Sequence, residues 1–273
     1  MDVYFWGSQM ARFCPLFSGS SGNSYYIGSA KEGILIDAGR SAKQITDMLN
    51  SCEIEIAAVK AIFITHEHSD HVAGLRVLAS RHHIPVYASE GTLNALEAMG
   101  CVNEKVQAGT IDDHGLSVAG MKITPFPISH DSAECVGYQI ETSDGRKIAL
   151  STDLGYLSDQ VRNCLAGSDM VVLESNHDVG MLQNGPYPYV LKRRILSKTG
   201  HLSNDACASE LESLVRGGST RFVLAHLSLE NNTPDLAFQT SLCALKLSGM
   251  KQGHDFELYV APRANTENRT IVF

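Results

Sequence analysis

The segment 65–71 reads Thr-His-Glu-His-Ser-Asp-His and is dense in side chains that can bind a metal ion. It directly follows the apolar stretch 61–64, which predicts a buried strand with a polar site at its end. His66 and His68 are two positions apart, so an extended or tightly turned backbone can direct both imidazoles to the same side.

Asp70 and His71 follow at the start of a helix that we predict over 70–81. They can face a second centre beside the first, so one short loop could supply half of the ligands of two metal ions. The alternative is a polar loop whose histidines are only solvated. The density of ligand types in this segment favours the metal site.

The pattern His-x-His-x-Asp-His resembles the signature of the metallo-β-lactamase fold. The resemblance implies further ligands downstream, and His130, Asp153 and His226 supply them in order, each at the end of an apolar run. Ligands at strand ends are typical of sites in α/β folds. The implied scheme makes Asp153 the bridge between two ions, one held by His66, His68 and His130 and the other by Asp70, His71 and His226.

Imidazole and carboxylate ligands suit Zn²⁺ best and leave Mn²⁺ or Fe²⁺ possible. Two such ions lower the pKa of a shared water toward ~7 and clamp phosphate oxygens. We therefore expect hydrolysis with a metal-bridging hydroxide as nucleophile and with Asp70 at the catalytic centre. Redox use is disfavoured because diiron members of the family carry Glu where His68 stands. A β-lactamase is disfavoured because those enzymes usually carry Cys where Asp153 stands.

Two further segments, 172–178 and 200–206, resemble a Glu-containing strand end and a Gly-His-Ser/Thr segment of ribonuclease Z and its nuclease relatives. The resemblance implies that Glu174 orients His201 and that His201 is the general acid. Phosphodiester hydrolysis needs such an acid because an alkoxide leaves poorly. The alternatives are a buried structural carboxylate at a helix terminus for Glu174 and a helix flank capped by Ser203 for His201.

A set of motifs resembles the YycJ/WalJ-type metallo-hydrolases of bacteria over residues 12 to about 260. The motifs read SGSSGN, THEHSDH, ESNHD, LKRRILSKTGHLSN and AHLSLENN. The implied activity is that of a nuclease, in particular an exonuclease with DNA as substrate. The chain lacks the long arm of ribonuclease Z and the inserted domain of ribonuclease J, which disfavours tRNA maturation and large-RNA processing.

The net charge of −8 and the pI of about 5.7 are unusual for a nucleic-acid-binding protein. However, Lys192, Arg193, Arg194 and Lys198 cluster just before His201, and two metal ions would add about +4 locally. We predict that Arg193 and Arg194 bind substrate phosphates, with a solvated surface as the alternative. His177 has no place among the ligands and is expected to touch the substrate or to pair with Asp178.

The elements that must position these residues are predicted helices and strands that alternate along the chain. Runs of predicted strands are each closed by predicted helices, in two rounds, which fits two β-sheets packed face to face with helices outside. The first round leads to Asp153. In the second, helices at 158–165, 204–216 and 234–247 separate strands at 170–174, 221–225 and 256–261, with a less regular segment after 174. The resemblance implies an α+β, four-layer αββα sandwich with two mixed sheets.

Composition predicts one domain over 1–273, because 44% of the residues are hydrophobic and no linker divides the chain. Residues 1–11 read as an N-terminal extension, and translation could begin at Met1 or Met10. Seven cysteines, an odd number without a CxxC pair, favour a reducing cytoplasm. No signal peptide and no run of ~20 apolar residues occurs, so no membrane partner is expected.

Two other functions are compatible with the sequence. A glyoxalase II-like thioester or lactone hydrolase shares the histidine motif and the other ligands, but Glu174, His201 and the basic run argue against it. A non-catalytic regulator with the same fold has no chemical need for seven matched ligands. A metal-dependent phosphodiesterase that cleaves nucleic acid is therefore the preferred interpretation.

Overall fold

The computed structural model describes residues 11–272. The expected N-terminal extension and the choice between Met1 and Met10 lie, apart from Ala11, outside the described residues. None of the helices within this range is long and apolar enough to cross a membrane.

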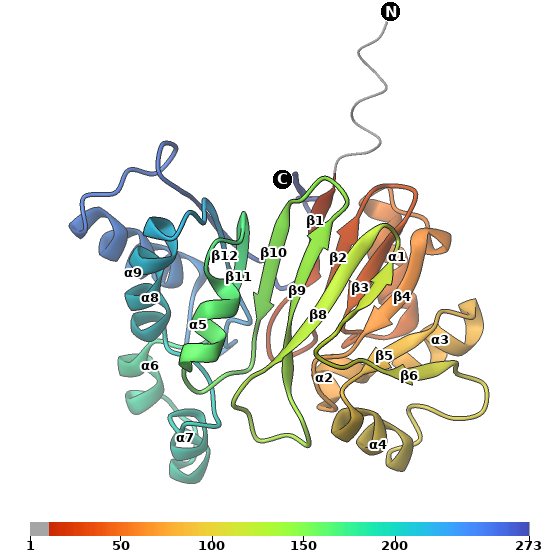
Figure 1. Cartoon of the computed structure of the whole chain (residues 1–273). Helices are drawn as coiled ribbons and strands as arrows, with labels where there is room; N and C mark the ends of the chain where they lie inside the picture. The colour runs from red at the N-terminus through yellow and green to blue at the C-terminus, as the bar shows by residue number, and fades with distance from the viewer. Residues whose placement is uncertain (1–10, 273) are drawn as a thin grey trace, which may run out of the picture.

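Two seven-stranded sheets form the centre of the molecule (Figure 1). The first has the order β14-β1-β2-β3-β4-β5-β6 and the second β13-β12-β11-β10-β9-β8-β7. The strands of the first are β1 (Arg12–Phe17), β2 (Ser24–Gly28), β3 (Gly33–Ile36), β4 (Val59–Phe63), β5 (Val86–Ala88), β6 (Ala108–Thr110) and β14 (Ile271–Val272). Those of the second are β7 (Leu116–Val118), β8 (Met121–Pro127), β9 (Val136–Thr142), β10 (Lys147–Ser151), β11 (Met170–Glu174), β12 (Arg221–Ala225) and β13 (Glu257–Val260).

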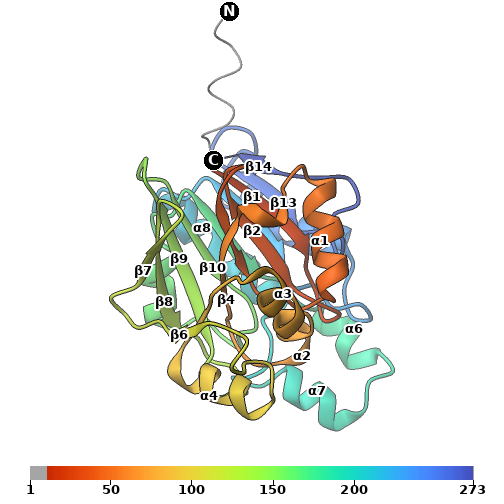
Figure 2. The same ribbon diagram turned by 90° about the vertical axis from the view of Figure 1, so that its right-hand side faces the viewer.

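Helices cover the outer face of each sheet (Figures 1 and 2). The helices that pack on the first sheet are α1 (Ala42–Ser51), α3 (Leu75–His82) and α4 (Glu90–Ala98), and those on the second are α5 (Asp159–Leu165), α8 (Asn204–Arg216) and α9 (Pro234–Leu247). One buried cluster lies between the sheets and one lies beneath each helical layer. The α+β sandwich with two mixed sheets is thus confirmed.

Side-chain alternation along the strands explains these layers. In β3, Ile34 and Ile36 belong to the cluster between the sheets, whereas Leu35 faces the helices on the first sheet. Successive strand residues point to opposite faces, so a strand buried on both faces is apolar throughout. This is why these strands appear in the sequence as continuous apolar runs rather than as alternating patterns.

The structure differs from the sequence expectations at three places. The helix predicted over 70–81 is two helices, α2 (Ser69–Val72) and α3, with Gly74 between them. The segment after 174, expected to be irregular, contains α6 (Val179–Asn184) and α7 (Tyr189–Ile195). The edge strands β6 and β14, of three and two residues, were not predicted.

Parallel pairing determines where the site forms. β3, β4 and β5 are parallel neighbours in the first sheet, and β10 to β13 are parallel neighbours in the second. The carboxyl ends of parallel strands meet at one edge of their sheet, where ligands commonly bind. The two such edges lie at the same end of the sandwich, because the residues that follow β4, β10 and β12 form one cluster.

Candidate metal centre

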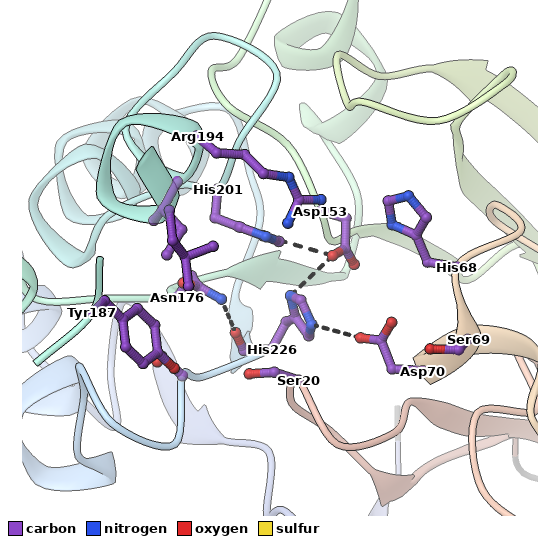
Figure 3. A pocket seen from close by; sticks show the side chains of 13 residues that line it. Ser20, His68, Ser69, Asp70, Asp153, Asn176, Tyr187, Arg194, His201 and His226 are labelled. Atoms are coloured by element: carbon purple, nitrogen blue, oxygen red, sulfur yellow. Dashed lines mark hydrogen bonds and ion pairs between the residues drawn. The ribbon is translucent and has the colours of Figure 1, made fainter. Parts of the chain in front are cut away.

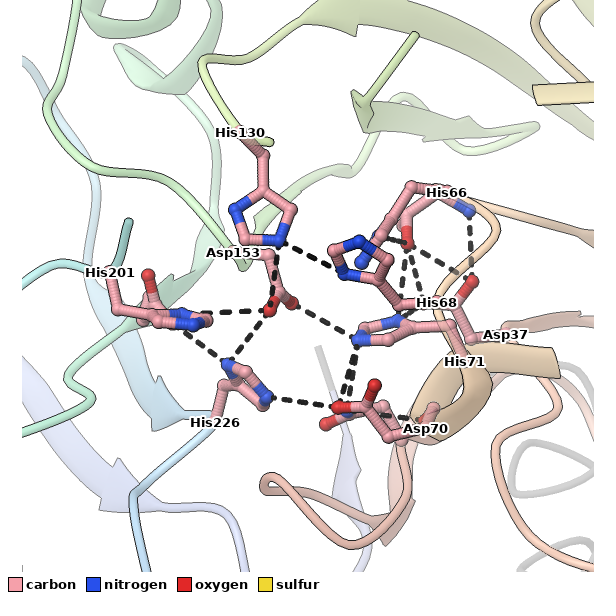
Figure 4. Close-up of polar contacts among 12 residues, drawn as sticks. Asp37, His66, His68, Asp70, His71, His130, Asp153, His201 and His226 are labelled. Carbon is pink, nitrogen blue, oxygen red and sulfur yellow. Dashed lines mark hydrogen bonds and ion pairs between the residues drawn. The ribbon is translucent and has the colours of Figure 1, made fainter. Parts of the chain in front are cut away.

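The seven expected ligands lie together at the strand ends (Figure 4). Asp153 and His226 follow β10 and β12 and have positive φ angles of 60° and 56°. Residues other than glycine seldom adopt this backbone, but Asp and His adopt it more readily than most, and such strained positions are concentrated at functional sites. The sharp turn lets each side chain leave the strand direction and point into the cluster.

Two groups of three potential ligands correspond to the two expected ions. One ligand atom each from His66, His68 and His130 lies within 4.8 Å of the others, and the same holds for Asp70, His71 and His226. Asp153 lies between the groups: its Oδ2 is 3.2 Å from His71 Nε2 and its Oδ1 is 4.0 Å from His130 Nε2. This is the position that a bridging carboxylate needs.

Outer contacts of Nδ1 in His66, His71 and His130 leave the Nε2 atom of each ring directed at the centre. His71 Nδ1 donates to Asp37 Oδ2 at 2.8 Å, and His130 Nδ1 donates to the carbonyl of Gly200 at 3.2 Å. His66 Nδ1 contacts Thr65 Oγ1 at 3.0 Å, and this hydroxyl in turn donates to Asp37. Such outer contacts fix the tautomer and the direction of metal-binding imidazoles.

Unpartnered buried atoms show that the residues fit a metal. The Nε2 atoms of His66 and His226 are buried and have no hydrogen-bond partner among residues 11–272. Buried polar nitrogens without a partner are costly, and a metal ion supplies the missing interaction. The donor set of imidazoles and carboxylates is compatible with zinc, manganese or iron.

Glu174 is completely buried at the end of β11 and binds both histidines that flank it. Its Oε1 accepts from Nδ1 of His201 at 2.9 Å and from Nδ1 of His226 at 2.8 Å. Its Oε2 accepts from the backbone N–H groups of Leu154 and Leu202. The expected Glu174–His201 contact is therefore present, but Glu174 also holds an expected metal ligand, which the sequence did not suggest.

The electrostatics of this group follow from its contacts. Burial raises the pKa of Glu174, but His201 and His226 outweigh that effect and hold the pKa below its usual range. Burial lowers the pKa of His201, whereas Glu174 and Asp153 raise it, and the net shift is upward. Glu174 is therefore a carboxylate at neutral pH that faces the Nδ1–H of two imidazoles.

A pocket of about 350 Å³ opens onto this cluster (Figure 3). His68, Asp70, Asp153, His201 and His226 form its inner wall, and Ser20, Asn176, Tyr187, Leu191, Arg194 and Ser228 are among the residues that line the rest. Arg194 is held by Asp131, with Nη2 donating to Oδ1 at 2.8 Å. A cation thus stands in the wall of the same pocket that Asp70 and Asp153 line.

The other expected substrate-binding residues lie elsewhere. Arg193 does not line the pocket and instead lies over the ring of Tyr189. His177 is 1% exposed and also does not line the pocket, and burial lowers its pKa to about 4. Its ring is therefore neutral at pH 7, has no hydrogen-bond partner among residues 11–272 and does not pair with Asp178.

Sequence reasoning missed two parts of the site. Asp37 follows β3 with a φ of 62°, in the same way that Asp153 and His226 follow their strands. Its place directly after an apolar run was the signal in the sequence that could have identified it. The loop 18–23 brings Ser20 to the pocket, and Ser18 Oγ accepts from the backbone N–H of His226. No spacing rule connects residues 18 and 226.

Comparison with known proteins decides the family. The model of the beta-lactamase superfamily domain matches residues 33–227. The chain belongs to this superfamily. Within the superfamily, it is 39% identical over 252 residues to the exodeoxyribonuclease YycJ of Bacillus anthracis, covering 90% of this chain and 94% of the relative. It is 37% identical over 257 residues to the exodeoxyribonuclease WalJ of Streptococcus pneumoniae, covering 91% and 93%.

The expected resemblance to YycJ/WalJ-type proteins is thus confirmed. A solved structure of the short form of human tRNase Z has the same superfamily fold, with a TM-score of 0.62 at 16% identity over 95% of this chain and 98% of that one. The superfamily match and the buried His/Asp clusters identify this chain as a metal-dependent hydrolase.

Proposed function

We propose that the protein is a dinuclear metal-dependent phosphodiester hydrolase that degrades DNA as an exonuclease. The observation that carries the proposal is the Glu174–His201 hydrogen bond beside the seven clustered ligands. The exodeoxyribonuclease names of YycJ and WalJ support DNA as the substrate. We propose zinc as the metal because imidazoles predominate among the ligands, and the cytoplasm as the compartment because the seven cysteines are unpaired.

His66, His68 and His130 would hold one ion, Asp70, His71 and His226 the other, and Asp153 would bridge them. When bound, two such ions activate a water and neutralise charge on the phosphate. The side chains of the pocket do the rest. Arg194, which lines the pocket, would bind a phosphate oxygen, and the buried Glu174 would keep His201 directed at the pocket.

His201 would donate a proton to the leaving oxygen. Its Nδ1–H is bound by Glu174, so the protonated ring presents Nε2–H to the pocket, where the side chain is 14% exposed. An alkoxide leaving group needs this proton, whereas p-nitrophenolate does not. A thioester hydrolase would also have little need for it, because a thiolate leaves easily.

The test compares His201→Ala on two substrates. We expect kcat on end-labelled DNA to fall by ~10²–10⁴, the usual range for a general acid, while hydrolysis of bis-(p-nitrophenyl) phosphate falls much less and metal content stays normal. Glu174→Gln should also weaken metal binding, because Glu174 holds His226 as well. Equal losses on both substrates, or loss of metal from His201→Ala, would remove the acid role. Thioester hydrolysis by the wild type without phosphodiester cleavage would favour the glyoxalase II-like alternative.

A further inference from the structure

Two exposed tyrosines lie on segments that also carry residues of the pocket, and each is accompanied by a cation. Tyr189 begins α7 and is 73% exposed, and the guanidinium carbon of Arg193 lies 5.9 Å from the centre of its ring. Tyr156 is 44% exposed, and Nζ of Lys198 lies 6.0 Å from the centre of its ring. Aromatic side chains with this much surface gain more by being covered than by facing water.

Tyr156 and Lys198 lie close along the chain to residues of the metal centre. Tyr156 follows Asp153 by three residues, and Lys198 precedes His201 by three. Gly155 allows the two loops to touch, because a Cβ at this position would lie 2.2 Å from the carbonyl group of Lys198. The contact therefore joins the loop that carries Asp153 and Tyr156 to the loop that carries Lys198 and His201.

The Tyr189–Arg193 pair lies on the other face of a helix that forms the pocket wall. Leu191, Arg194 and Ile195 of α7 line the pocket, whereas Tyr189 and Arg193 do not. In both ribbon views, α7 lies at the end of the molecule away from the chain termini (Figures 1 and 2). A molecule bound at the centre can therefore continue over this helix.

We propose that Tyr156 and Tyr189, with Lys198 and Arg193, form a platform on which the bases of an unpaired DNA strand stack beside the cleaved phosphate. The inference rests on the proposed DNA hydrolysis and specifies the form of DNA. Stacking on an aromatic ring uses the face of a base, which is available only outside a duplex. The four cations within 192–198 match a polyanion better than they match an apolar protein surface, in a chain whose net charge is −8.

The first test measures Kd by fluorescence anisotropy for a single-stranded oligonucleotide with cleavage-resistant phosphorothioate linkages, on the metal-loaded enzyme. Tyr156→Ala and Tyr189→Ala should each raise Kd about five-fold or more, the lower end of what one stacked base contributes. Tyr156→Phe and Tyr189→Phe keep the ring and should stay within about two-fold of the wild type. Tyr259→Ala is the matched control, because Tyr259 is an exposed tyrosine on β13 outside the platform.

An abasic oligonucleotide separates stacking from phosphate contacts. The wild type should bind it more weakly than normal DNA, and the two alanine substitutions should weaken its binding less than about two-fold. Binding of a duplex whose two ends are closed by hairpin loops too short to leave free bases should also change less than about two-fold in the two alanine variants. The platform is wrong if both alanine variants bind normal single strands as the wild type does, or if they lose as much affinity for the abasic strand.

Binding is measured without turnover, so the two proposals can fail separately. If the wild type binds single strands through these tyrosines but cleaves no phosphodiester, the proposed function is wrong and the platform remains. If the wild type degrades DNA while the tyrosine variants bind unchanged, the function remains and the platform is wrong.

Discussion

At the scale of single residues, the precision of the centre depends on side chains that would not touch a metal. Asp37 accepts hydrogen bonds from His71, from the Thr65 hydroxyl and from the Thr65 backbone N–H, and it is completely buried. Through Thr65 it also acts on His66, so one carboxylate orients an expected ligand of each ion. Outer contacts of this kind commonly change metal affinity without changing the ligands.

Asp37→Asn should therefore lower metal affinity by ~10–100-fold while all seven ligands remain. Asparagine tolerates the left-handed backbone at this position, so the change tests the lost charge and acceptor rather than the turn. Competition with a chromophoric chelator gives the affinity. Asp47→Asn, at an exposed carboxylate on α1, is the control and should bind metal as the wild type does. Unchanged affinity in Asp37→Asn would show that the ligands hold their positions without it.

At the scale of elements, the metal loop is positioned by close backbone contacts. A Cβ at Gly39 would lie 1.7 Å from the carbonyl oxygen of Asp70, and one at Gly74 would lie 2.0 Å from that of Arg40. Asn23 joins the same contact, since its backbone N–H donates to Asp70 and its carbonyl accepts from Gly39. Three loops are thus interlocked around Asp70, which explains why the predicted helix over 70–81 is interrupted at Gly74.

Gly39→Ala should destabilise the protein by about 1–3 kcal/mol, because backbone atoms must move to admit the methyl group. It should also reduce metal occupancy, since Asp70 moves with its carbonyl. Denaturant unfolding and elemental analysis measure the two effects. At Gly109, in the short strand β6, the nearest atom to a new Cβ is a ring carbon of Tyr87 at 3.3 Å, so Gly109→Ala should cost much less. Similar stability of the two variants would contradict the interlocking.

At the scale of the whole molecule, the centre joins the two halves of the chain. His66, His68, Asp70 and His71 follow a strand of the first sheet, whereas His130, Asp153 and His226 follow strands of the second. Metal ions bound to both groups should resist separation of the sheets. Without metal, each half carries buried histidines and carboxylates that lack this interaction.

Removal of the metal should consequently lower the melting temperature. A ligand at 100 times its Kd stabilises the folded state by about 2.7 kcal/mol, which corresponds to roughly 5 °C or more for a chain of this size. Thermal unfolding before and after chelation, followed by restoration with zinc, measures the effect. Asp153→Ala should reduce the difference, because it removes the carboxylate between the two groups. A melting temperature that does not respond to chelation would contradict a metal shared between the halves.

The sequence by itself determined the ligand types and the strand ends that carry them. The apolar run before His-x-His-x-Asp-His marked that motif as a site at a strand end, and the family resemblance implied His130, Asp153 and His226, each of which also follows an apolar run; such local patterns persist in the folded chain. The sandwich followed from the order of elements together with the family resemblance. The short helices α6 and α7, of six and seven residues, were not predicted.

Only the tertiary structure decided the contacts between distant segments. It brings Glu174 to both His201 and His226, Asp37 to His71, and Ser18 to the backbone of His226. It also places Arg194 in the pocket and Arg193 over Tyr189, although the two arginines are neighbours in the sequence. The physical reason is that the orientation of a helix about its axis determines which of its side chains face the pocket, and the pairing of parallel strands determines which strand ends lie side by side. Neither can be read from the spacing of the residues along the chain.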